Sequence, residues 1–405
     1  MAVFLHGAGK SYTYEELIEN INRGTTYCPY FQNKDLYAYF VNFIKALVTN
    51  RPIVLIDADC SSSDMPYLDF SQVNKPQEVG LCAFQNMEEL IDAVSRSISE
   101  ITIFTSGTTG QPKRVVHSVG TLARNVRRGE QYKEHVWAYA YNPTHMAGTQ
   151  VFFQALMNQS TIVNVFGESR MVVYQQIERY GITHISATPT FYRMLMPFEK
   201  AYPSVKRVTL GGEKSDKQLY EHICKIFPNA KVNNVYASTE AGSLFAAKDD
   251  CFQIPVNIRD KFRVENDELL IHKSLLGQSD SFAFDGEYYH SGDLIEWLNE
   301  EDGLFRFKSR KNELINVGGY KVNPGEIEDA INAIEGVQQS LVYGRANSIL
   351  GNIVVAEVKL VDGATLTDLE IRMMLANQLQ DFKVPRKIQI VEELSMTRTG
   401  KLKRS

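Results

Sequence analysis

The residues whose types and spacing best suit chemistry form one nine-residue string, Thr105-Ser-Gly-Thr-Thr-Gly-Gln-Pro-Lys113. It follows the apolar run Ile101-Thr-Ile-Phe104, so we expect a loop that leaves a strand. Four hydroxyls, several backbone amides and one cation suit the binding of a polyphosphate. The string is not a Walker A loop, because only two residues separate Gly107 from Gly110. A glycine-rich surface turn is the alternative interpretation.

Further strings with chemically useful side chains follow in order along almost the whole chain. They are Ser11-Tyr-Thr-Tyr-Glu-Glu-Leu17, Tyr236-Ala-Ser-Thr-Glu-Ala-Gly242, His290-Ser-Gly-Asp-Leu294, Ser309-Arg-Lys-Asn-Glu-Leu-Ile315, Val317-Gly-Gly-Tyr-Lys-Val-Asn-Pro-Gly-Glu-Ile-Glu328 and Thr399-Gly-Lys-Leu-Lys-Arg404. Together with the first string they resemble the signatures of the adenylate-forming superfamily, which includes acyl- and aryl-CoA ligases, peptide-synthetase adenylation domains and firefly luciferase. The chain looks like a short AMP-dependent synthetase of the acyl- or aryl-CoA ligase kind.

The resemblance implies a site for ATP and Mg²⁺. Attack of a carboxylate on the α-phosphate of ATP brings anions together, so the site must neutralise charge. Glu240 resembles the family's magnesium-binding glutamate, since a hard carboxylate oxygen suits that ion. Thr239 would contact the phosphate and take part in catalysis. The alternative for Glu240 is an ordinary surface residue after a strand.

The resemblance also implies contacts to the nucleoside. Asp293 would accept hydrogen bonds from the ribose hydroxyls, with Arg310 in the same region. Tyr236 resembles the aromatic residue that stacks on adenine, although a plain strand tyrosine is the alternative. Glycines would let the backbone approach the base. The expected nucleotide-binding residues are Thr105, Ser106, Gly107, Thr108, Thr109, Gly110, Lys113, Gly211, Gly212, Tyr236, Asp293 and Arg310.

Lys401 resembles the family's catalytic lysine, which bridges the carboxylate and α-phosphate oxygens during adenylation. Its ammonium is a compact charge on a long side chain, which suits this task. The alternative is that Arg398, Lys401, Lys403 and Arg404 form a solvated basic tail.

The carboxylic acid is expected to bind near Asn142-Pro-Thr-His-Met-Ala-Gly148, which resembles a Pro-x-x-His-x-x-Gly segment of acyl- and aryl-CoA ligases. His145 would lie at the entrance for acid and thiol and assist catalysis, although a lone histidine is often an ordinary packed residue. No acidic residue occurs between Asn142 and Gly167, which counts against an α-amino acid substrate. The expected pocket residues are His145, Gly148, Thr188 and Ala237.

The chain also departs from the family pattern. Thr13 and Thr105 are 92 positions apart, a short N-terminal region. Ala237 replaces the usual glycine and should narrow the acid pocket by a methyl group. Asn312 replaces the usual hinge Asp or Lys, and Met396-Thr397 replaces the usual Pro and basic residue before the last motif.

The sequence pattern predicts an α/β arrangement of the elements that position these residues. Short β-rich runs ending in turn residues alternate with helical stretches, including strands over 205–210 and 231–236 and a hairpin over 262–271. After about residue 310 the pattern becomes a compact α+β unit, with a helix carrying Ile327, Ala330, Ile331 and Ile334, strands over 337–343 and 353–360, and a helix capped by Thr367 and carrying Ile371, Met374 and Leu375. We therefore expect a large multi-layered α/β N-terminal domain (1–309), a hinge (310–312) and a small mobile α+β C-terminal domain (313–405).

Composition excludes some classes of protein. A net charge of −5 in 405 residues argues against a nucleic-acid binder. The apolar runs are too short to span a bilayer, and the first residues lack the pattern of a secretory signal. Five scattered cysteines without a CxxC pair indicate reduced thiols and a cytoplasmic protein.

We therefore predict an enzyme that forms acyl-AMP from ATP, Mg²⁺ and a small carboxylic acid, and then transfers the acyl group to the thiol of CoA. The resemblance implies that the small domain rotates and brings Gly318 and Gly319 beside a narrow pantetheine channel. The nearest alternative loads the phosphopantetheine thiol of an acyl-carrier protein. A catalytically idle, nucleotide-binding paralogue is a third possibility.

Overall fold

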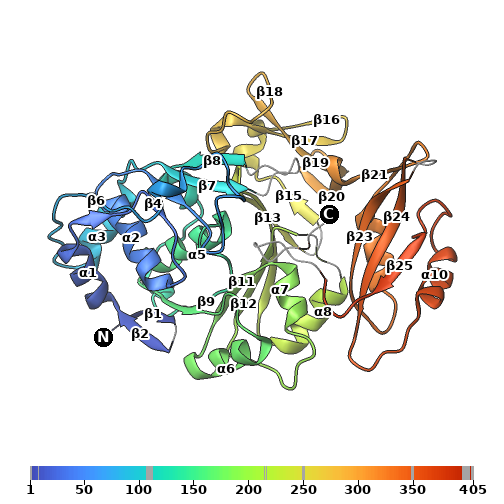
Figure 1. Cartoon of the computed structure of the whole chain (residues 1–405), viewed down its shortest axis with the longest axis horizontal. Coiled ribbons are helices and arrows are strands. Elements are labelled where there is room, and N and C mark those ends of the chain that lie inside the picture. The colour runs from blue at the N-terminus through green and yellow to red at the C-terminus, as the bar shows by residue number, and fades with distance from the viewer. Residues whose placement is uncertain are drawn as a thin grey trace.

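The fold was analysed in a computed structural model, which describes residues 2–7, 9–105, 113–213, 215, 217–248, 251–347, 351–394 and 402. In Figure 1 the blue N-terminal helices lie at the left, the green parallel strands in the centre and the orange to red C-terminal sheet at the right. In the described ranges, no helix is both long enough and apolar enough to cross a membrane.

Parallel strands form the centre of the large sheet. In spatial order they are β1 (Val3–Gly7), β10 (Thr161–Asn164), β9 (Val136–Tyr139), β11 (His184–Ala187), β12 (Arg207–Gly211) and β13 (Lys231–Ser238). The helices that follow these strands are α5 (Met146–Leu156), α6 (Arg170–Tyr180), α7 (Pro189–Met194) and α8 (Lys217–Ile226). Parallel strands alternating with helices confirm the expected α/β class.

Both faces of this sheet are covered. Successive strand residues point to opposite faces, so Ala138 packs in one core and Tyr139 in the other. One core is shared with α5, α1 (Tyr14–Arg23), α2 (Leu36–Val48) and α3 (Met87–Ser95), and the other with α6, α7 and α8. Because the strands are parallel, the loops that follow them all lie at the carboxyl edge of the sheet, where ligands of α/β proteins usually bind.

Antiparallel strands extend the sheet beyond β13. They are β14 (Gly242–Lys248), β15 (Cys251–Gln253), β20 (Leu304–Arg310), β19 (Tyr288–Asn299), β17 (Glu268–His272) and β16 (Phe262–Glu265), with β18 (Phe284–Asp285) beside β19. The hairpin predicted over 262–271 is confirmed as β16–β17. Its turn residues Asn266 and Asp267 both have positive φ, as Asn and Asp tolerate better than other non-glycine residues.

A second sheet carries the predicted phosphate-binding string. Its order is β4 (Tyr30–Phe31), β5 (Ile53–Leu55), β7 (Ile101–Thr105) and β8 (Lys113–His117), while β2 (Lys10–Thr13) pairs with β1, and β3 (Thr26–Tyr27) with β6 (Gln77–Glu78). β7 and β8 are antiparallel, with Thr105 opposite Lys113. The string thus begins and ends on adjacent strands of one hairpin, and the helix α4 (Val119–Leu122) follows β8.

The residues after Arg310 build a separate sheet with its own core. Its elements are β21 (Ile315–Val317), β22 (Tyr320–Val322), α9 (Pro324–Asn332), β23 (Val337–Asn347), β24 (Gly351–Leu360), α10 (Asp368–Ala376) and β25 (Lys387–Ile390). The chain enters it through the short 3₁₀ helix η5 (Lys311–Glu313). The capping box of Thr367 is confirmed, and Ile371 and Leu375 are buried as expected. Met374 on the same helix is 40% exposed, because α10 turns only one side toward the sheet.

Candidate active site

Three charged or polar side chains from β13, β19 and β20 of the large sheet form one cluster. The Tyr236 hydroxyl donates to Asp293 Oδ2 at 2.5 Å, and Arg310 Nε donates to Asp293 Oδ1 at 2.7 Å. Asp293 and Arg310 are direct register partners on β19 and β20. Three residues that the sequence assigned separately to the nucleoside are therefore brought into one hydrogen-bonded group.

The electrostatics of this cluster fix its protonation. The Asp293 side chain is only 7% exposed, and its negative charge raises the pKa of the Arg310 guanidinium above its ordinary value. Burial, together with the neighbouring Asp293, also raises the pKa of the Tyr236 phenol well above its ordinary value. These pKa shifts keep the Arg310 guanidinium charged and the Tyr236 phenol neutral at physiological pH. A carboxylate has about four acceptor positions, so Asp293 can still accept from ribose hydroxyls.

The Tyr236 ring is itself held by aromatic neighbours. Phe307 of β20 stacks on it, with centroids 4.6 Å apart and planes at 26°, and the cross-strand neighbour Phe245 lies at 5.7 Å. Offset stacking of this kind holds a ring in place. Since Phe307 occupies one face of the ring, at most the other face remains for an adenine base. The sequence did not single out Phe307.

The turn that carries Thr239 and Glu240 connects β13 to β14. The Thr239 carbonyl accepts a hydrogen bond from His117 Nε2 at 2.8 Å, and the Glu240 carbonyl accepts one from the Gly277 amide at 2.8 Å. Burial lowers the pKa of His117 to about 4, so this imidazole is neutral at physiological pH.

Mg²⁺ fits this turn as a partner of bound ATP rather than as a resident ion. Among the described residues there is no group of three or more His, Cys, Asp and Glu side chains that could hold a metal by themselves. Mg²⁺ usually keeps several waters and uses one or two carboxylates together with substrate phosphates. The Glu240 carboxylate on this turn could supply one such oxygen ligand.

The glycines after β12 lie at the same edge of the sheet. A Cβ on Gly211 would lie 3.3 Å from the Val235 carbonyl oxygen, and Gly212 has a φ of +83°, so both positions favour glycine. The next residue, Glu213, accepts hydrogen bonds from the Thr190 amide and hydroxyl through Oε2, at 3.0 and 2.8 Å. Its Oε1 accepts from the backbone amide of Leu402 at 3.2 Å.

Some predicted residues fall outside the described ranges. Lys401 and five phosphate-loop positions belong to this group: Ser106, Gly107, Thr108, Thr109 and Gly110. Thr105 and Lys113 are placed as the paired ends of the β7–β8 hairpin. Leu402, which follows Lys401 in the chain, is placed beside Glu213.

The predicted acid-pocket residues lie in the first turn of a helix, at its N-cap, or near the end of a strand. His145 is the N-cap residue of α5, and Thr188 is the N-cap residue of α7, where its side chain accepts from the Phe191 amide. A Cβ on Gly148 would lie 2.5 Å from the Asn142 carbonyl oxygen, so packing alone requires glycine there. Ala237 lies on β13 next to a bulge.

An acidic side chain from a distant segment reaches this region. The Asn142 side chain donates to Asp57 Oδ2 at 2.8 Å, and the Asp59 amide donates to Asp57 Oδ1 at 3.1 Å. The absence of acidic residues over 142–167 therefore does not exclude a nearby carboxylate, although both oxygens of Asp57 already accept hydrogen bonds from the chain itself.

The predicted thiol-channel glycines form the turn between β21 and β22. Gly318 and Gly319 have φ values of +56° and +92°, so each adopts a backbone conformation that favours glycine. Both are exposed, and the Gly319 amide donates to the Asn316 side chain at 3.1 Å. They lie on the C-terminal sheet, whereas Tyr236 and Asp293 lie on the large one.

Comparison with known proteins identifies the origin of this arrangement. The profile of the AMP-binding enzyme family matches residues 48–263, more than half of the chain, and that of the AMP-binding enzyme C-terminal domain matches residues 326–401. The chain belongs to the AMP-binding enzyme family. The first match covers the described phosphate-loop hairpin, the β12 glycines and the β13–β14 turn.

Named relatives of this AMP-binding enzyme are CoA ligases. It is 27% identical over 341 residues to a 2-succinylbenzoate–CoA ligase of Staphylococcus epidermidis, covering 76% of this chain and 69% of the relative. It is 26% identical over 343 residues to an acetyl-coenzyme A synthetase of Bacillus subtilis, covering 74% and 59%. Its fold matches an O-succinylbenzoate coenzyme A synthetase of Bacillus subtilis solved with ATP and magnesium ion, with a TM-score of 0.71, 20% identity, and coverage of 100% of this chain and 95% of that one.

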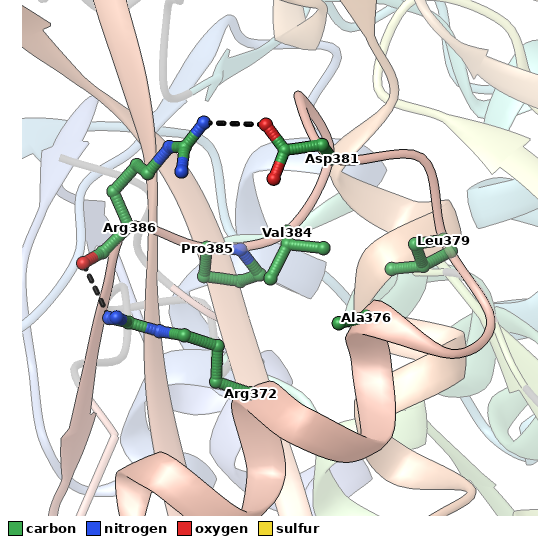
Figure 2. A pocket seen from close by; sticks show the side chains of 7 residues that line it. All are labelled: Arg372, Ala376, Leu379, Asp381, Val384, Pro385 and Arg386. Carbon is green, nitrogen blue, oxygen red and sulfur yellow. Dashed lines mark hydrogen bonds and ion pairs between the residues drawn. The ribbon is translucent and has the colours of Figure 1, made fainter.

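A surface hollow in the C-terminal part of the AMP-binding enzyme is distinct from this site. Figure 2 shows it between α10 and the segment that leads into β25. Its volume is about 190 Å³. Arg386 is paired with Asp381 at 2.9 Å, and Arg372 donates to the Arg386 carbonyl at 2.6 Å. Each guanidinium uses one nitrogen in these contacts, and we assign no ligand to the hollow.

Sequence reasoning missed His117, Glu213, Asp57 and Phe307. Each contributes through a partner that is distant in sequence, such as Thr239 for His117, 122 positions away. A usable signal existed for Glu213, because it directly follows the recognised Gly211-Gly212 pair. The signal for His117 was its position at the end of the strand that follows the phosphate-binding string.

Proposed function

We propose that this AMP-binding enzyme is an ATP-dependent acid–CoA ligase. It joins a carboxylic acid to AMP, releases pyrophosphate, and then transfers the acyl group to the thiol of CoA. The observation that carries the proposal is the hydrogen-bonded group of Tyr236, Asp293 and Arg310, in the same carboxyl-edge region as the β13–β14 turn. It provides a carboxylate that can accept hydrogen bonds from a ribose, held in place beside the stacked ring of Tyr236.

The first half-reaction needs positive charge where two anions meet. Lys113 at the end of the phosphate-binding hairpin, Mg²⁺ held with the help of Glu240, and Lys401 are proposed to supply it. Mg²⁺ would neutralise charge on the phosphates of bound ATP. Thr239 is proposed to contact the phosphate, and Gly211 and Gly212 to lie against the base.

The second half-reaction needs a different group beside the acyl-AMP. We propose that residues 313–405 rotate about a hinge at 310–312, relative to an N-terminal domain of residues 1–309. This movement would exchange Lys401 for the Gly318–Gly319 turn, whose lack of side chains leaves room for a pantetheine arm. CoA is preferred to a carrier-protein thiol because the named relatives act on CoA.

The proposed substrate is a non-amino carboxylic acid, either aromatic or of short to medium chain length. An α-ammonium group would need a free anionic partner, since an unpaired buried charge costs several kcal/mol. The Asp57 carboxylate, which contacts Asn142 at the start of the predicted acid-binding segment, already accepts two hydrogen bonds from the chain. The methyl group of Ala237 disfavours bulky groups beside the carboxylate. With five free cysteines, we also propose a cytoplasmic location.

The test is ATP–pyrophosphate exchange with three sets of acids: benzoates including 2-succinylbenzoate, C2–C10 fatty acids, and the twenty amino acids. We expect exchange with a member of the first two sets, followed by thioester formation when CoA is added. The matched control is Lys401→Ala with the same acids, which should show no exchange. Exchange with amino acids alone would contradict the substrate class. No exchange with any acid, together with tight ATP binding, would favour an idle nucleotide-binding protein.

A further inference from the structure

The two segments expected to hold Mg·ATP belong to different sheets, and one buried histidine joins them. β8 ends the phosphate-binding hairpin in the four-strand path β4-β5-β7-β8, whereas Thr239 and Glu240 follow β13 of the large sheet. His117 is the last residue of β8 and is only 3% exposed. Its Nε2 lies 2.8 Å from the Thr239 carbonyl oxygen. Because a carbonyl oxygen only accepts, Nε2 carries the hydrogen and donates it.

The His117 ring is held on its other sides as well. Its Nδ1 lies 3.2 Å from the Thr121 hydroxyl oxygen. Gly277 packs against the ring so closely that a Cβ there would lie 2.5 Å from the imidazole Cε1. The Gly277 amide in turn donates to the Glu240 carbonyl at 2.8 Å. A shift of the imidazole would therefore disturb both residues of the turn, Thr239 directly and Glu240 through Gly277.

Other links between the same segments do not reach this turn. Val116 and Gln278 exchange two backbone hydrogen bonds of 2.8 Å, and the Asn125 side chain donates to the Ser243 carbonyl at 2.6 Å. These contacts hold β8 and α4 near β14 and residues 277–278. In the described ranges, the His117 imidazole is the side chain of the hairpin that bonds directly to the turn.

We propose that His117 is a positioning residue that sets the distance between the phosphate-binding hairpin and the Thr239–Glu240 turn, and thereby determines how strongly magnesium tightens ATP binding. The inference rests on the proposed function. Mg²⁺ demands near-ideal octahedral geometry, with oxygen ligands at about 2.0–2.1 Å. Ligand oxygens from ATP and from Glu240 therefore have to be placed precisely relative to one another. ATP without metal does not depend on that placement.

The experiment measures ATP binding by calorimetry, in MgCl₂ and in EDTA, for the full-length wild type and its variants. His117→Phe fills the site without a donor, and His117→Gln keeps an N–H donor at a similar reach. Asn125→Ala is the matched control, because it removes another link between the same segments. If His117→Phe does not fold, His117→Met replaces it, since the flexible methionine adapts to irregular cavities.

We expect His117→Phe to weaken binding of ATP in MgCl₂ by about tenfold, the scale typical of residues that orient metal ligands, and to leave binding in EDTA unchanged. His117→Gln and Asn125→Ala should bind Mg·ATP within about twofold of the wild type. The proposal is overturned if folded His117→Phe or His117→Met binds as the wild type does. It is also overturned if Asn125→Ala shows the same loss, or if ATP in EDTA weakens equally. A wild type that binds ATP but exchanges no pyrophosphate would contradict the proposed function alone, whereas one that binds no ATP would contradict both.

Discussion

Replacing Tyr236 with phenylalanine tests the nucleoside cluster most sharply. The change removes one hydrogen bond of 2.5 Å to the largely buried Asp293 carboxylate and keeps the ring that stacks on Phe307. Hydrogen bonds to charged groups contribute about 1.5–3 kcal/mol to stability. Arg310 still pairs with Asp293 in this variant, so the carboxylate keeps one charged partner. We therefore expect the free energy of unfolding to fall by about 2 kcal/mol. For a domain of about 309 residues, with an unfolding entropy of about 2.1 cal/mol/K per residue, this corresponds to a decrease of roughly 3 °C in the melting temperature.

The same variant should weaken nucleotide binding, because the Tyr236 hydroxyl helps to orient the carboxylate that is expected to hold the ribose. If the loss of this orientation weakens the free energy of AMP binding by about 1.4 kcal/mol, the Kd for AMP rises about tenfold. Calorimetry with AMP and thermal unfolding measure the two effects. The matched control is Tyr343→Phe, which removes a 3.0 Å bond from a tyrosine hydroxyl to Glu357 in the C-terminal sheet. The control should leave AMP binding unchanged. Unchanged melting and unchanged AMP affinity in Tyr236→Phe would refute the reasoning.

Four further outcomes are expected. Lys401→Ala should slow acyl-AMP formation by about a thousandfold, because the lysine charge is needed only as two anions meet. Thioester formation from supplied acyl-AMP should continue. Equal losses in both steps, measured separately, would contradict this role. Glu240→Gln should raise the magnesium concentration required for half-maximal pyrophosphate exchange without changing the melting temperature, since the amide keeps the size and loses the charge. Glu213→Ala should slow acyl-AMP formation more than thioester formation, because it loses the hydrogen bond to the Leu402 amide. The two rates are measured separately, and equal losses in both would contradict this role. Burial lowers the pKa of His184 to about 3. Below pH 6.5 this histidine therefore binds a proton in the unfolded chain but not in the folded chain. The free energy of unfolding should consequently fall as the pH drops from 6.5 toward 3. In melting curves between pH 5 and 7.5, His184→Phe should lose less stability than the wild type, and an equal loss would exclude His184 as a cause.

Local signals predicted many of the elements but not always their ends or their buried faces. The β16–β17 hairpin and the start of α10 were predictable because turn residues and capping boxes act within a few positions. The predicted helix over 327–334 ends earlier, at Asn332, although Ile334 remains buried beyond its end. The exposure of Met374 was not predictable, since periodicity does not show how wide a stripe of a helix its neighbours will cover.

The site shows the same limit more strongly. The motifs named Tyr236, Asp293 and Arg310, but not that one carboxylate would accept hydrogen bonds from both of the others. Tyr236 and Asp293 are 57 positions apart, and their contact depends on the order of strands β13, β14, β15, β20 and β19 across the sheet. Strand order is set by the packing of the whole sheet, which no local string encodes. The roles assigned to His145, Gly318, Gly319 and Lys401 stay predictions.

The distribution of hydrogen bonds suits the two-step reaction proposed for this enzyme. The nucleoside cluster is complete at Arg310, before the chain enters the C-terminal sheet, so its contacts would persist if that sheet moved. Contacts that cross to the C-terminal part include polar ones, such as Leu402 to Glu213 and the Asn323 side chain to the Lys308 carbonyl at 2.8 Å. Polar interfaces within a chain separate more easily than large hydrophobic ones. Because each half-reaction needs a different group beside the same nucleotide, a firmly held nucleoside and a C-terminal part attached through polar bonds serve both steps.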